Sequence, residues 1–583
     1  MRKNLSWLSA FLLILCGSYL QGQVVVYNYP DTLAYSQSLG KNLRSFLYQV
    51  DIRQANKTYS SYVLADENTF PDGQRNLMTD WHHFSTFSFQ GEIEVEITRL
   101  DGRNIQKATV YPLAFKVPFE YAGNKLKLRL TEPRKLYIEL DGLEKQPLFL
   151  FADALEKDPP KPEASNVLLL KPGMSAEEVK NAITQSNRPI VYFAPGIHRF
   201  GVEKDISYPG YRLPLLSNKT YYIPGEAYVQ ATFYGDNVSN TRVQGRGIIS
   251  LCGQERLGSG VPGSFNYHAI FFNGPGQNQV VEGITINNVP HFCILSRGTL
   301  QCNNVKLFGW WHQTDGFGGG DASLIEDSFL KVNDDYVKLY RPKNQAKNLV
   351  IYKQINGAVI QLGWNTYGAC QDCLAEDIYV VKDAPKVPGT ISNTAVINLV
   401  NNEGSNISGV NIRNVFMDND VQRSIGLKTS GGKVSNLRVS NLSLRGKNLA
   451  SNYIIAPMGS EIQGIQLENI QINGRCINNN AEYNLQMDGN VSELVYVCGT
   501  SSSKEQLSKD TFSIMMHRNE LYVLNHQLSG KGHLMVFDLA GREVLKGTIE
   551  GPESRLKLNA PKGMYVVKID WEGAIWTGKL VWP

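Results

Sequence analysis

The sequence predicts an all-β fold, with an N-terminal β-sandwich followed by a right-handed parallel β-helix and then a small C-terminal β-sandwich-like module. The 583 residues include 52 glycines and 25 prolines, and only 19% are charged, which is typical of a chain with many turns and few long helices. Short runs of alternating apolar and polar residues occupy both ends of the chain. Between them, an asparagine-containing motif recurs in steps of 21 to 37 residues, which indicates stacked repeats.

Residues 1–22 have the pattern of a signal peptide. The first residues are basic, an apolar stretch ends at Leu15, and small residues precede a plausible cleavage site before Gln23. Cys16 could instead suggest a lipoprotein, but Leu15 is bulky where a small residue is expected before such a cysteine. We therefore expect a secreted or outer-surface protein. No later stretch approaches the roughly 20 apolar residues of a membrane-spanning helix, so we expect no transmembrane segment and a soluble mature chain.

Residues 23–155 alternate apolar and polar side chains in short runs such as His83–Ile97, Lys125–Leu130 and Leu136–Leu140. Asp-Gly, Ala-Gly and Glu-Pro turns separate these runs. The pattern predicts antiparallel strands in a β-sandwich whose sheets each have one face in water. The proline-rich and charged residues 156–165 predict a linker after the sandwich.

Residues 166–498 carry the repeats of the predicted β-helix. One α-helix is expected at its start, where Ser175 and Glu178 form a capping box. In the repeats, inward-facing Ile, Val and Leu side chains would stack into a continuous core. The polar residue of each repeat would hydrogen-bond to its counterpart on the next coil. These polar residues are Asn304, Asp327, Asn348, Asp377, Asn414, Asn441 and Asn469.

After a second predicted linker at 499–510, residues 511–583 form a compact β-rich module. It contains an Asp538-x-x-Gly-Arg542 element, a Gly563-x-Tyr-x-Val567 element and a final Lys579-x-Val581. These elements resemble the C-terminal sorting domain of type IX secretion substrates. The resemblance implies a secretion machinery as partner and carriage across an outer membrane, with release or surface attachment. The alternative is an ordinary terminal β-module.

Composition also bears on partners. The net charge is only +4 from 58 basic and 54 acidic residues, and no dense basic run with interleaved aromatic residues occurs, so nucleic acid is not expected to bind. Seven cysteines remain besides Cys16, and an odd number leaves at least one thiol free. Cys370 and Cys373 form a lone CxxC, which favours a short disulfide or buried thiols over zinc. We expect a monomer.

Three carboxylates lie in an otherwise apolar, aromatic and glycine-rich window, at Asp315, Asp334 and Asp335. Because carboxylates are costly to desolvate, the window predicts a concave acidic site. The 19 residues from Asp315 to Asp334 match about one coil, which would separate the carboxyl groups by roughly 5 to 9.5 Å, as glycosidic hydrolysis requires. Adjacent residues of a strand face opposite ways, so the chain must bend at Asp334. The alternative roles are turn capping and calcium binding; we expect neither a metal nor a cofactor.

The same region supplies candidates for substrate contacts. Flat aromatic rings suit the faces of sugars, and polar side chains suit hydroxyl groups, although such aromatic residues also fill β-helix cores. Gly318–Gly320 lacks the lysine of a phosphate loop and is interpreted as room for substrate. The candidates for stacking are Trp310, Trp311, Tyr336, Tyr340 and Trp364, and those for hydroxyl contacts are His312, Gln313, Lys338, Arg341, Gln361 and Asn365.

The segments Gln313-Thr-Asp315-Gly and Asn333-Asp334-Asp335 resemble glycoside hydrolase family 49, the dextranase and isopullulanase family. The resemblance implies a β-sandwich joined to a β-helix and an α-glucan substrate, with the α-1,6 links of dextran foremost. It implies Asp334 as general acid, and Asp315 and Asp335 as the groups that activate water for an inverting attack.

Three other functions stay open at this stage. Polygalacturonases share a T-D-G element and an aspartate pair, but they also carry Gly-His and Arg-Ile-Lys elements, where this chain has Gly363-Trp364 and Val337-Lys338. A pullulan-cleaving or other polysaccharide hydrolase is one alternative and a polysaccharide lyase is another. A carbohydrate-binding β-helix without activity is the third.

Overall fold

The computed structural model describes most of the chain as two compact units, residues 1–497 and residues 498–583. The predicted signal peptide up to residue 21 and the predicted linker at 499–510 lie outside the described residues. The described ranges are 22–28, 34–36, 41–42, 44–68, 79–200, 212–251, 268–364, 370–384, 393–402, 404–498, 512–517, 520–525, 530–538, 542–558, 560–571 and 574–582.

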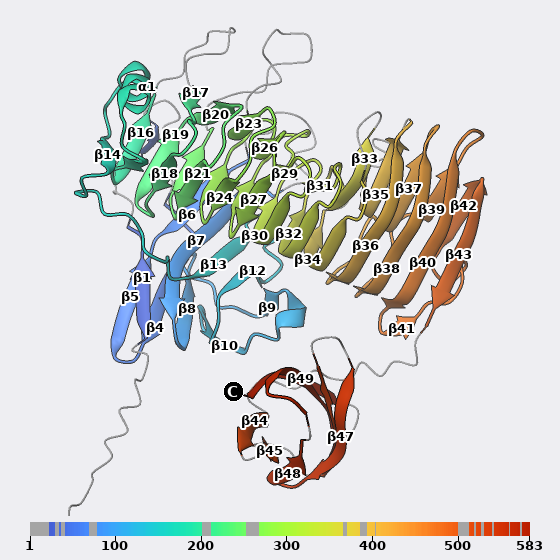
Figure 1. The fold of residues 1–583 in the computed structure, drawn as a ribbon. Coiled ribbons are helices and arrows are strands. Elements are labelled where there is room, and N and C mark those ends of the chain that lie inside the picture. Colours follow the sequence, from blue (N-terminus) through green and yellow to red (C-terminus); the bar gives the residue numbers. More distant parts are fainter. Residues whose placement is uncertain are drawn as a thin grey trace, which may run out of the picture. The chain divides into compact units, whose positions relative to one another are not determined.

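A right-handed parallel β-helix forms the larger part of the first unit (Figure 1). One of its sheets runs along its length as β17 (Arg212–Pro214), β20 (Thr232–Asp236), β23 (Ile270–Asn273), β26 (Ile294–Ser296), β29 (Phe317–Gly318), β31 (Val337–Lys338), β33 (Ile360–Trp364), β35 (Ala395–Asn402), β37 (Arg423–Thr429), β39 (Asn452–Ala456) and β42 (Leu485–Gly489).

The other strands of the β-helix join into one continuous sheet, in the order β14 (Val167–Leu170), β15 (Ile190–Phe193), β16 (Gly196–Arg199), β18 (Thr220–Ile223), β19 (Ala227–Gln230), β21 (Arg242–Gly245), β22 (Ile248–Ser250), β24 (Gln279–Glu282), β25 (Thr285–Asn287), β27 (Leu300–Asn303), β28 (Lys306–Phe308), β30 (Leu324–Lys331), β32 (Gln345–Lys353), β34 (Leu374–Asp383), β36 (Asn406–Met417), β38 (Lys433–Leu444), β40 (Glu461–Ile472), β41 (Arg475–Cys476) and β43 (Val491–Val497).

The repeated polar residues turn each coil, as predicted. All seven have a positive φ, between 48° and 57°, a conformation that Asn and Asp tolerate better than most residues. The side chains also bond along the stack, because Asn441 Nδ2 donates to Asn414 Oδ1 at 3.0 Å and Asn469 Nδ2 donates to Asn441 Oδ1 at 2.9 Å. The predicted polar ladder is therefore confirmed between these coils.

Apolar side chains fill the interior of the β-helix as one continuous cluster from Leu170 to Leu485. The helix α1 (Ala176–Gln185) packs Val179 and Ile183 against this cluster at its N-terminal end. The predicted capping box is present, since the Ser175 hydroxyl accepts from the Glu178 amide and the Glu178 carboxylate accepts from the Ser175 amide. The helix thereby covers the first coil.

Two sheets form the N-terminal β-sandwich, and short strands β2 (Ala34–Ser36) and β3 (Lys41–Asn42) pair separately. One sheet contains β1 (Gln23–Val26), β7 (Trp81–Gln90), β13 (Leu148–Ala154), β12 (Arg134–Leu140) and β9 (Ala108–Tyr111), with β6 (Val63–Glu67) also paired to β7, and a 3-10 turn (Leu113–Phe115) follows β9. The other contains β10 (Phe119–Ala122), β11 (Lys125–Leu130), β8 (Ile93–Arg99), β4 (Tyr48–Gln54) and β5 (Lys57–Ser61).

The prediction that each sheet has one face in water is wrong for the first of these sheets. The prediction of antiparallel pairing is wrong for β13 and β7, which pair in parallel. Leu148 and Leu150 of β13 face the sandwich core, whereas Phe149 and Phe151 pack on Phe329 of the β-helix, with ring centroids 4.8 and 5.1 Å apart. The sheet is buried on both faces because the β-helix covers the outer one (Figure 1). The sandwich and β-helix thus share an apolar interface.

The second unit contains two antiparallel sheets around its own apolar core. The Asp538 carboxylate accepts from the Arg542 guanidinium at 2.8 Å, so the first and last residues of the D-x-x-G-R element contact each other. The strands are β44 (Phe512–His517), β45 (Glu520–Asn525) and β48 (Glu553–Lys557) in one sheet, and β47 (Glu543–Glu550), β46 (Lys531–Phe537), β49 (Gly563–Trp571) and β50 (Ala574–Trp582) in the other.

Free thiols occur among the described cysteines, as the odd number of seven cysteines besides Cys16 predicts. Cys293, Cys302, Cys370 and Cys373 are buried and reduced, so the lone CxxC is a pair of buried thiols in this structure. Cys476 and Cys498 are disulfide-bonded. Within the described residues, no helix is both long and apolar enough to cross a bilayer.

Candidate active site

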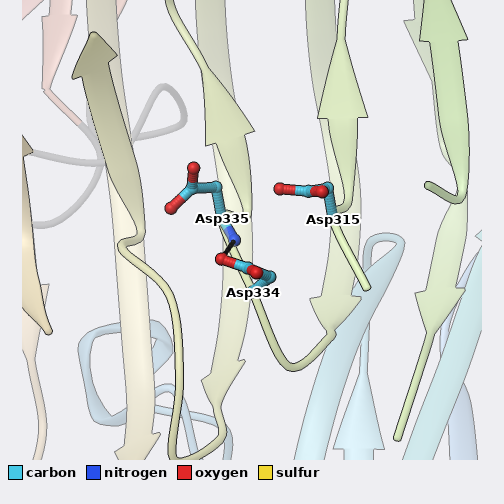
Figure 2. A group of neighbouring side chains, drawn as sticks. All are labelled: Asp315, Asp334 and Asp335. Atoms are coloured by element: carbon cyan, nitrogen blue, oxygen red, sulfur yellow. Dashed lines mark hydrogen bonds between the residues drawn. The ribbon is translucent and has the colours of Figure 1, made fainter. Parts of the chain in front are cut away.

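The three aspartates come together on consecutive coils (Figure 2). Asp315 lies just before β29, and Asp334 and Asp335 lie between β30 and β31. One carboxylate oxygen of each lies within 4.8 Å of the others. Phe317 pairs with Val337, and the Gly316 amide donates to the Asp335 carbonyl at 2.9 Å. Asp335 rather than Asp334 is therefore the direct neighbour of Asp315.

The backbone bends at 333 and 334, as the sequence argument required. Asn333 is fully buried and fixes this bend, since its Nδ2 donates to the Trp310 carbonyl at 2.8 Å and its Oδ1 accepts from the Asn356 amide at 3.1 Å. Gly357 lies against the Asp334 backbone with φ 82°, and a Cβ there would lie 2.0 Å from the Asp334 carbonyl carbon. Only glycine fits this contact.

Lys338 joins two of the carboxylates. Its Nζ lies 2.7 Å from Asp315 Oδ1 and 2.6 Å from Asp335 Oδ2. Burial favours a neutral lysine, but the negative charges of Asp315 and Asp335 outweigh it and hold the Lys338 pKa well above its usual range. The lysine is therefore a fixed cation between two carboxylates.

Asp335 accepts three further hydrogen bonds. Asn393 Nδ2 donates to its Oδ1 at 2.6 Å, the Ala358 amide donates to the same oxygen at 3.3 Å, and the Tyr340 hydroxyl donates to Oδ2 at 3.3 Å. An ionised carboxylate can accept at both oxygens, whereas a protonated one would have to donate from one of them. These donors suit Asp335 as a carboxylate.

Asp334 differs from its two neighbours. Burial of its carboxyl, together with the negative charges of Asp315 and Asp335, raises the Asp334 pKa well above its usual range. Asp334 keeps partial exposure, while Asp315 and Asp335 are only 4% and 2% exposed. The site thus combines one partly exposed carboxyl group with a raised pKa and two buried carboxyl groups that are bonded to a lysine.

Three predicted substrate-binding residues are fully buried, and the prediction that they contact substrate does not fit their positions. Trp310 lies between the His82 ring, stacked at 4.5 Å, and the Lys331 ammonium, 3.7 Å from its centroid. The Tyr336 hydroxyl donates to the Val332 carbonyl at 2.5 Å. Gln361 donates from Nε2 to the Gly363 carbonyl at 2.8 Å. Tyr336 lies in the β-helix core, His82 of the sandwich covers Trp310, and Gln361 is bonded to Asn398 on the next coil.

The remaining predicted contacts differ in exposure. Trp311, Tyr340 and Trp364 are partly exposed and His312, Gln313 and Arg341 are exposed, so a ligand can reach them. Lys338 is partly exposed but is bonded to the aspartates. Asn365 lies outside the described residues.

The glycine triplet does not leave room for substrate. Gly318, Gly319 and Gly320 are buried, and a Cβ on Gly320 would lie 2.6 Å from the carbonyl oxygens of Arg297 and Gly298. These glycines permit close packing of adjacent coils, which corrects the interpretation from the sequence.

The Asn393 contact to Asp335 was not found from the sequence. Asn393 lies 58 residues after Asp335 and directly before β35, two coils further along. No local motif marks it, because loop insertions of uneven length hide which asparagine faces the site. Only the strand register shows this proximity.

No family model matches the chain. In sequence, it is 24% identical over 404 residues to a dextranase of Arthrobacter globiformis, a match that covers 55% of this chain and 60% of that protein. It is 22% identical over 438 residues to an isopullulanase of Aspergillus niger, covering 65% of this chain and 74% of that protein. The chain thus spans less than two thirds of the dextranase.

In structure, the chain is similar to Dex49A from Penicillium minioluteum, with a TM-score of 0.61 and 17% identity. The superposition covers 77% of this chain and 94% of Dex49A, which supports the β-helical fold described above. Together these similarities support the resemblance to the dextranase and isopullulanase family that the aspartate motifs indicated.

Proposed function

We propose that the protein is a glycoside hydrolase that cleaves α-glucan, with the α-1,6 links of dextran as its main target. The observation that carries the proposal is the division of the three carboxyl groups, with a raised pKa at Asp334 and the Lys338 cation bound to Asp315 and Asp335. Hydrolysis of a glycosidic bond needs one carboxyl group that donates a proton and another that acts as a base, and this difference between the aspartates provides both. The similarity to proteins named dextranase and isopullulanase supports an α-glucan substrate.

In the proposed reaction, Asp334 donates its proton to the glycosidic oxygen as the bond to the anomeric carbon breaks. A water molecule held by Asp315 and Asp335 attacks that carbon, and this carboxylate pair takes up the proton that the water loses. Proton exchange with solvent then restores Asp334. Lys338 places a positive charge beside this pair, because its ammonium group bonds to each of them.

We propose that the reaction inverts the anomeric centre, as the family resemblance implies. The closest carboxylate oxygens lie within 4.8 Å, whereas inverting enzymes commonly hold the two carboxyl groups about 6.5 to 9.5 Å apart and retaining enzymes about 5 Å. Product stereochemistry therefore tests this step sharply. Proton NMR of the first products should show the β-anomer from an α-linked glucan, and an initial α-anomer would contradict inversion.

A neutral glucan suits this site better than a uronate. The Lys338 ammonium is already bonded to Asp315 and Asp335, so a uronate carboxylate beside it would face three carboxyl groups without a free cation from this lysine. Like charges at such distances repel strongly in a partly buried site. This argument favours dextran or pullulan over polygalacturonate.

We also propose that the chain is exported as a monomer, through residues 1–22, and that residues 511–583 are recognised by a type IX secretion machinery. The contact between Asp538 and Arg542 of the D-x-x-G-R element supports the second part. Fusing residues 511–583 to a periplasmic reporter in a host with this machinery should carry the reporter outside. Retention of the reporter in the periplasm would contradict the assignment.

The experiment that tests the activity is incubation of the purified protein with dextran, pullulan and polygalacturonate. New reducing ends from dextran, with isomalto-oligosaccharides as products, are the expected result. Products from pullulan alone would place the specificity on a different linkage. Products from polygalacturonate alone, or binding of glucan without any cleavage, would overturn the proposal.

A further inference from the structure

A row of outward-facing side chains runs along the sheet that carries Lys338. Strand register places Tyr234 beside Phe271, Phe271 beside Leu295, Leu295 beside Gly318, and Gly318 beside Lys338. Alternate residues of these strands, such as Phe233 and Ile270, lie in the β-helix core, so the row faces outward. Tyr234, Phe271 and Leu295 are each partly exposed.

Aromatic rings continue this row without a break toward the aspartates. The Phe271 centroid lies 5.6 Å from that of Tyr234 and 4.9 Å from that of His268, and both pairs meet edge to face. His268 in turn lies 5.1 Å from Phe292 and stacks on His291 at 4.7 Å. Four of these five rings are partly exposed and His268 is buried among them; together we call the five rings the ring platform.

Phe292 connects the ring platform to the acidic site. A Cβ on Gly318 would lie 3.6 Å from the Phe292 ring, so the ring covers the bare position next to Lys338 in the row. The Lys338 ammonium lies 5.3 Å from the Phe292 centroid while it bonds to Asp315 and Asp335. The ring platform therefore begins at the carboxylates and extends over the preceding coils.

The row has a different character on the other side of Lys338. Register continues it through Gln361, Asn398 and Gly426 to Tyr453. The first three are buried, and Asn398 Nδ2 donates to Gln361 Oε1 at 2.8 Å, so these side chains bond to one another. An aromatic side chain returns only at Tyr453, four coils beyond Lys338. The described part of the row is thus asymmetric.

We propose that the ring platform binds the α-glucan chain on one side of the cleaved bond, along the coils that precede Asp315. This inference rests on the proposed function and adds the placement of the longer bound stretch of sugar. Flat rings stack on the C–H faces of pyranoses. Two guanidinium groups lie at the edge of the ring platform: Arg212 is 4.5 Å from the Tyr234 centroid and Arg297 is 6.0 Å from the Phe271 centroid. They supply hydrogen-bond donors for sugar hydroxyl groups.

Chain length of the substrate provides the test. Phe271 lies three coils before Lys338, about 14 Å away at roughly 4.8 Å per coil, beyond the reach of a short substrate that spans the cleaved bond. Phe271→Ala should lower kcat/KM for isomaltoheptaose by about tenfold, the scale of one lost aromatic contact, and leave that for isomaltotriose unchanged. Phe271→Leu, which keeps apolar volume without a flat ring, should behave like Phe271→Ala if stacking is responsible.

Tyr453→Ala is the matched control, because Tyr453 is partly exposed in the same row on the opposite side of Lys338. This variant should leave kcat/KM unchanged for both isomaltoheptaose and isomaltotriose. An equal loss for both substrates in Phe271→Ala, or the same length dependence in Tyr453→Ala, would overturn the inference while the hydrolase stands.

A binding measurement tests the ring platform separately from the proposed hydrolase activity. Calorimetry of isomaltoheptaose with Asp334→Asn, and with Asp334→Asn carrying Phe271→Ala, measures the ring platform without cleavage. Weaker binding in the double variant supports the ring platform even if the wild-type protein cleaves no glucan. Equal binding by the two variants overturns it.

Discussion

The ammonium nitrogen of Lys338 lies 2.6 Å from Oδ2 of Asp335, and the two side chains are only 15% and 3% exposed. A second contact of the same nitrogen, 2.7 Å to Asp315 Oδ1, makes the lysine the shared counter-ion of two carboxylates. The nearby Asp334 differs from these two groups, because burial and the charges of Asp315 and Asp335 raise its pKa. The contacts of one lysine thereby distinguish Asp315 and Asp335, the proposed base, from Asp334, the proposed acid.

Replacing Lys338 tests this division. Lys338→Met leaves Asp315 and Asp335 without their cation, and breaking such a pair costs about 3–5 kcal/mol of unfolding free energy in a buried site, less here because the lysine is partly exposed. Loss of the positive charge disfavours ionised carboxylates, so the acid limb of the pH–rate profile should move to higher pH.

Lys347→Met is the control for that variant, because Lys347 pairs with Glu376 at 3.5 Å on the surface and is 32% exposed. It should change stability by less than about 0.5 kcal/mol and leave the pH–rate profile in place. An unshifted acid limb in Lys338→Met would show that the lysine does not set the charge of the aspartates.

The raised pKa of Asp334 predicts a pH-dependent stability. A group whose pKa is higher in the folded state stabilises the fold below its unfolded pKa, and this contribution is lost as the pH rises through the folded pKa. Asp334→Asn removes the charge that forms at high pH. The variant should therefore gain thermal stability relative to wild type as the pH rises.

Melting temperatures of wild type and Asp334→Asn, measured across the acidic and neutral range, check this expectation. The difference should be small at low pH, where the wild-type carboxyl group is protonated, and should grow as it ionises. A difference that stays constant with pH would contradict the raised pKa.

Asn393 should matter to the rate although it lies far from the acidic motif in sequence. Asn393→Ala removes the 2.6 Å hydrogen bond to Asp335 Oδ1, and hydrogen bonds to a charged group contribute about 1.5–3 kcal/mol. We expect kcat to fall by about 10- to 100-fold in dextran hydrolysis. Asn411→Ala is the control, since Asn411 is exposed on β36, and an equal loss in both variants would rule out a specific role for Asn393.

The polar ladder should contribute to stability. Asn441→Ala removes a bond donated to Asn414 and one accepted from Asn469, and it places alanine at φ 54°. Chemical denaturation should show a loss of about 1–3 kcal/mol from these two effects. Asn441→Gly, which tolerates the positive φ, should lose less than Asn441→Ala. Equal losses would show that the backbone conformation contributes nothing.

Much of the fold follows from local sequence. The asparagine spacing predicted the coils because a side-chain ladder and a left-handed turn both favour Asn or Asp at one position of every coil. The capping box at Ser175 was also predictable from local sequence, since Ser175 and Glu178 are only three residues apart. The apolar outer face of the first sandwich sheet was not, because alternation alone does not reveal that Phe149 and Phe151 meet the β-helix.

The acidic site was predictable in part. Spacing by about one coil was enough to bring Asp315 near Asp334 and Asp335, and alternation along a strand was enough to require the bend. Side-chain direction was harder to predict, as Trp310 shows: its aromatic ring suits a sugar equally well, but His82 of the sandwich covers it. The contact of Lys338 with Asp315 was not predictable, because it depends on the pairing of Gly318 with Lys338 in adjacent strands, and no pattern in the sequence gives that register.

The most direct test of the central claim is the initial rate of reducing-end formation from dextran by the wild-type protein and by Asp334→Asn. Asparagine keeps the shape of the side chain, but its amide is not acidic and cannot transfer a proton to the leaving oxygen. We expect steady product formation by wild type and a loss of about 10²- to 10⁴-fold in the variant. A loss of only a few-fold would contradict the assignment of Asp334 as the acid.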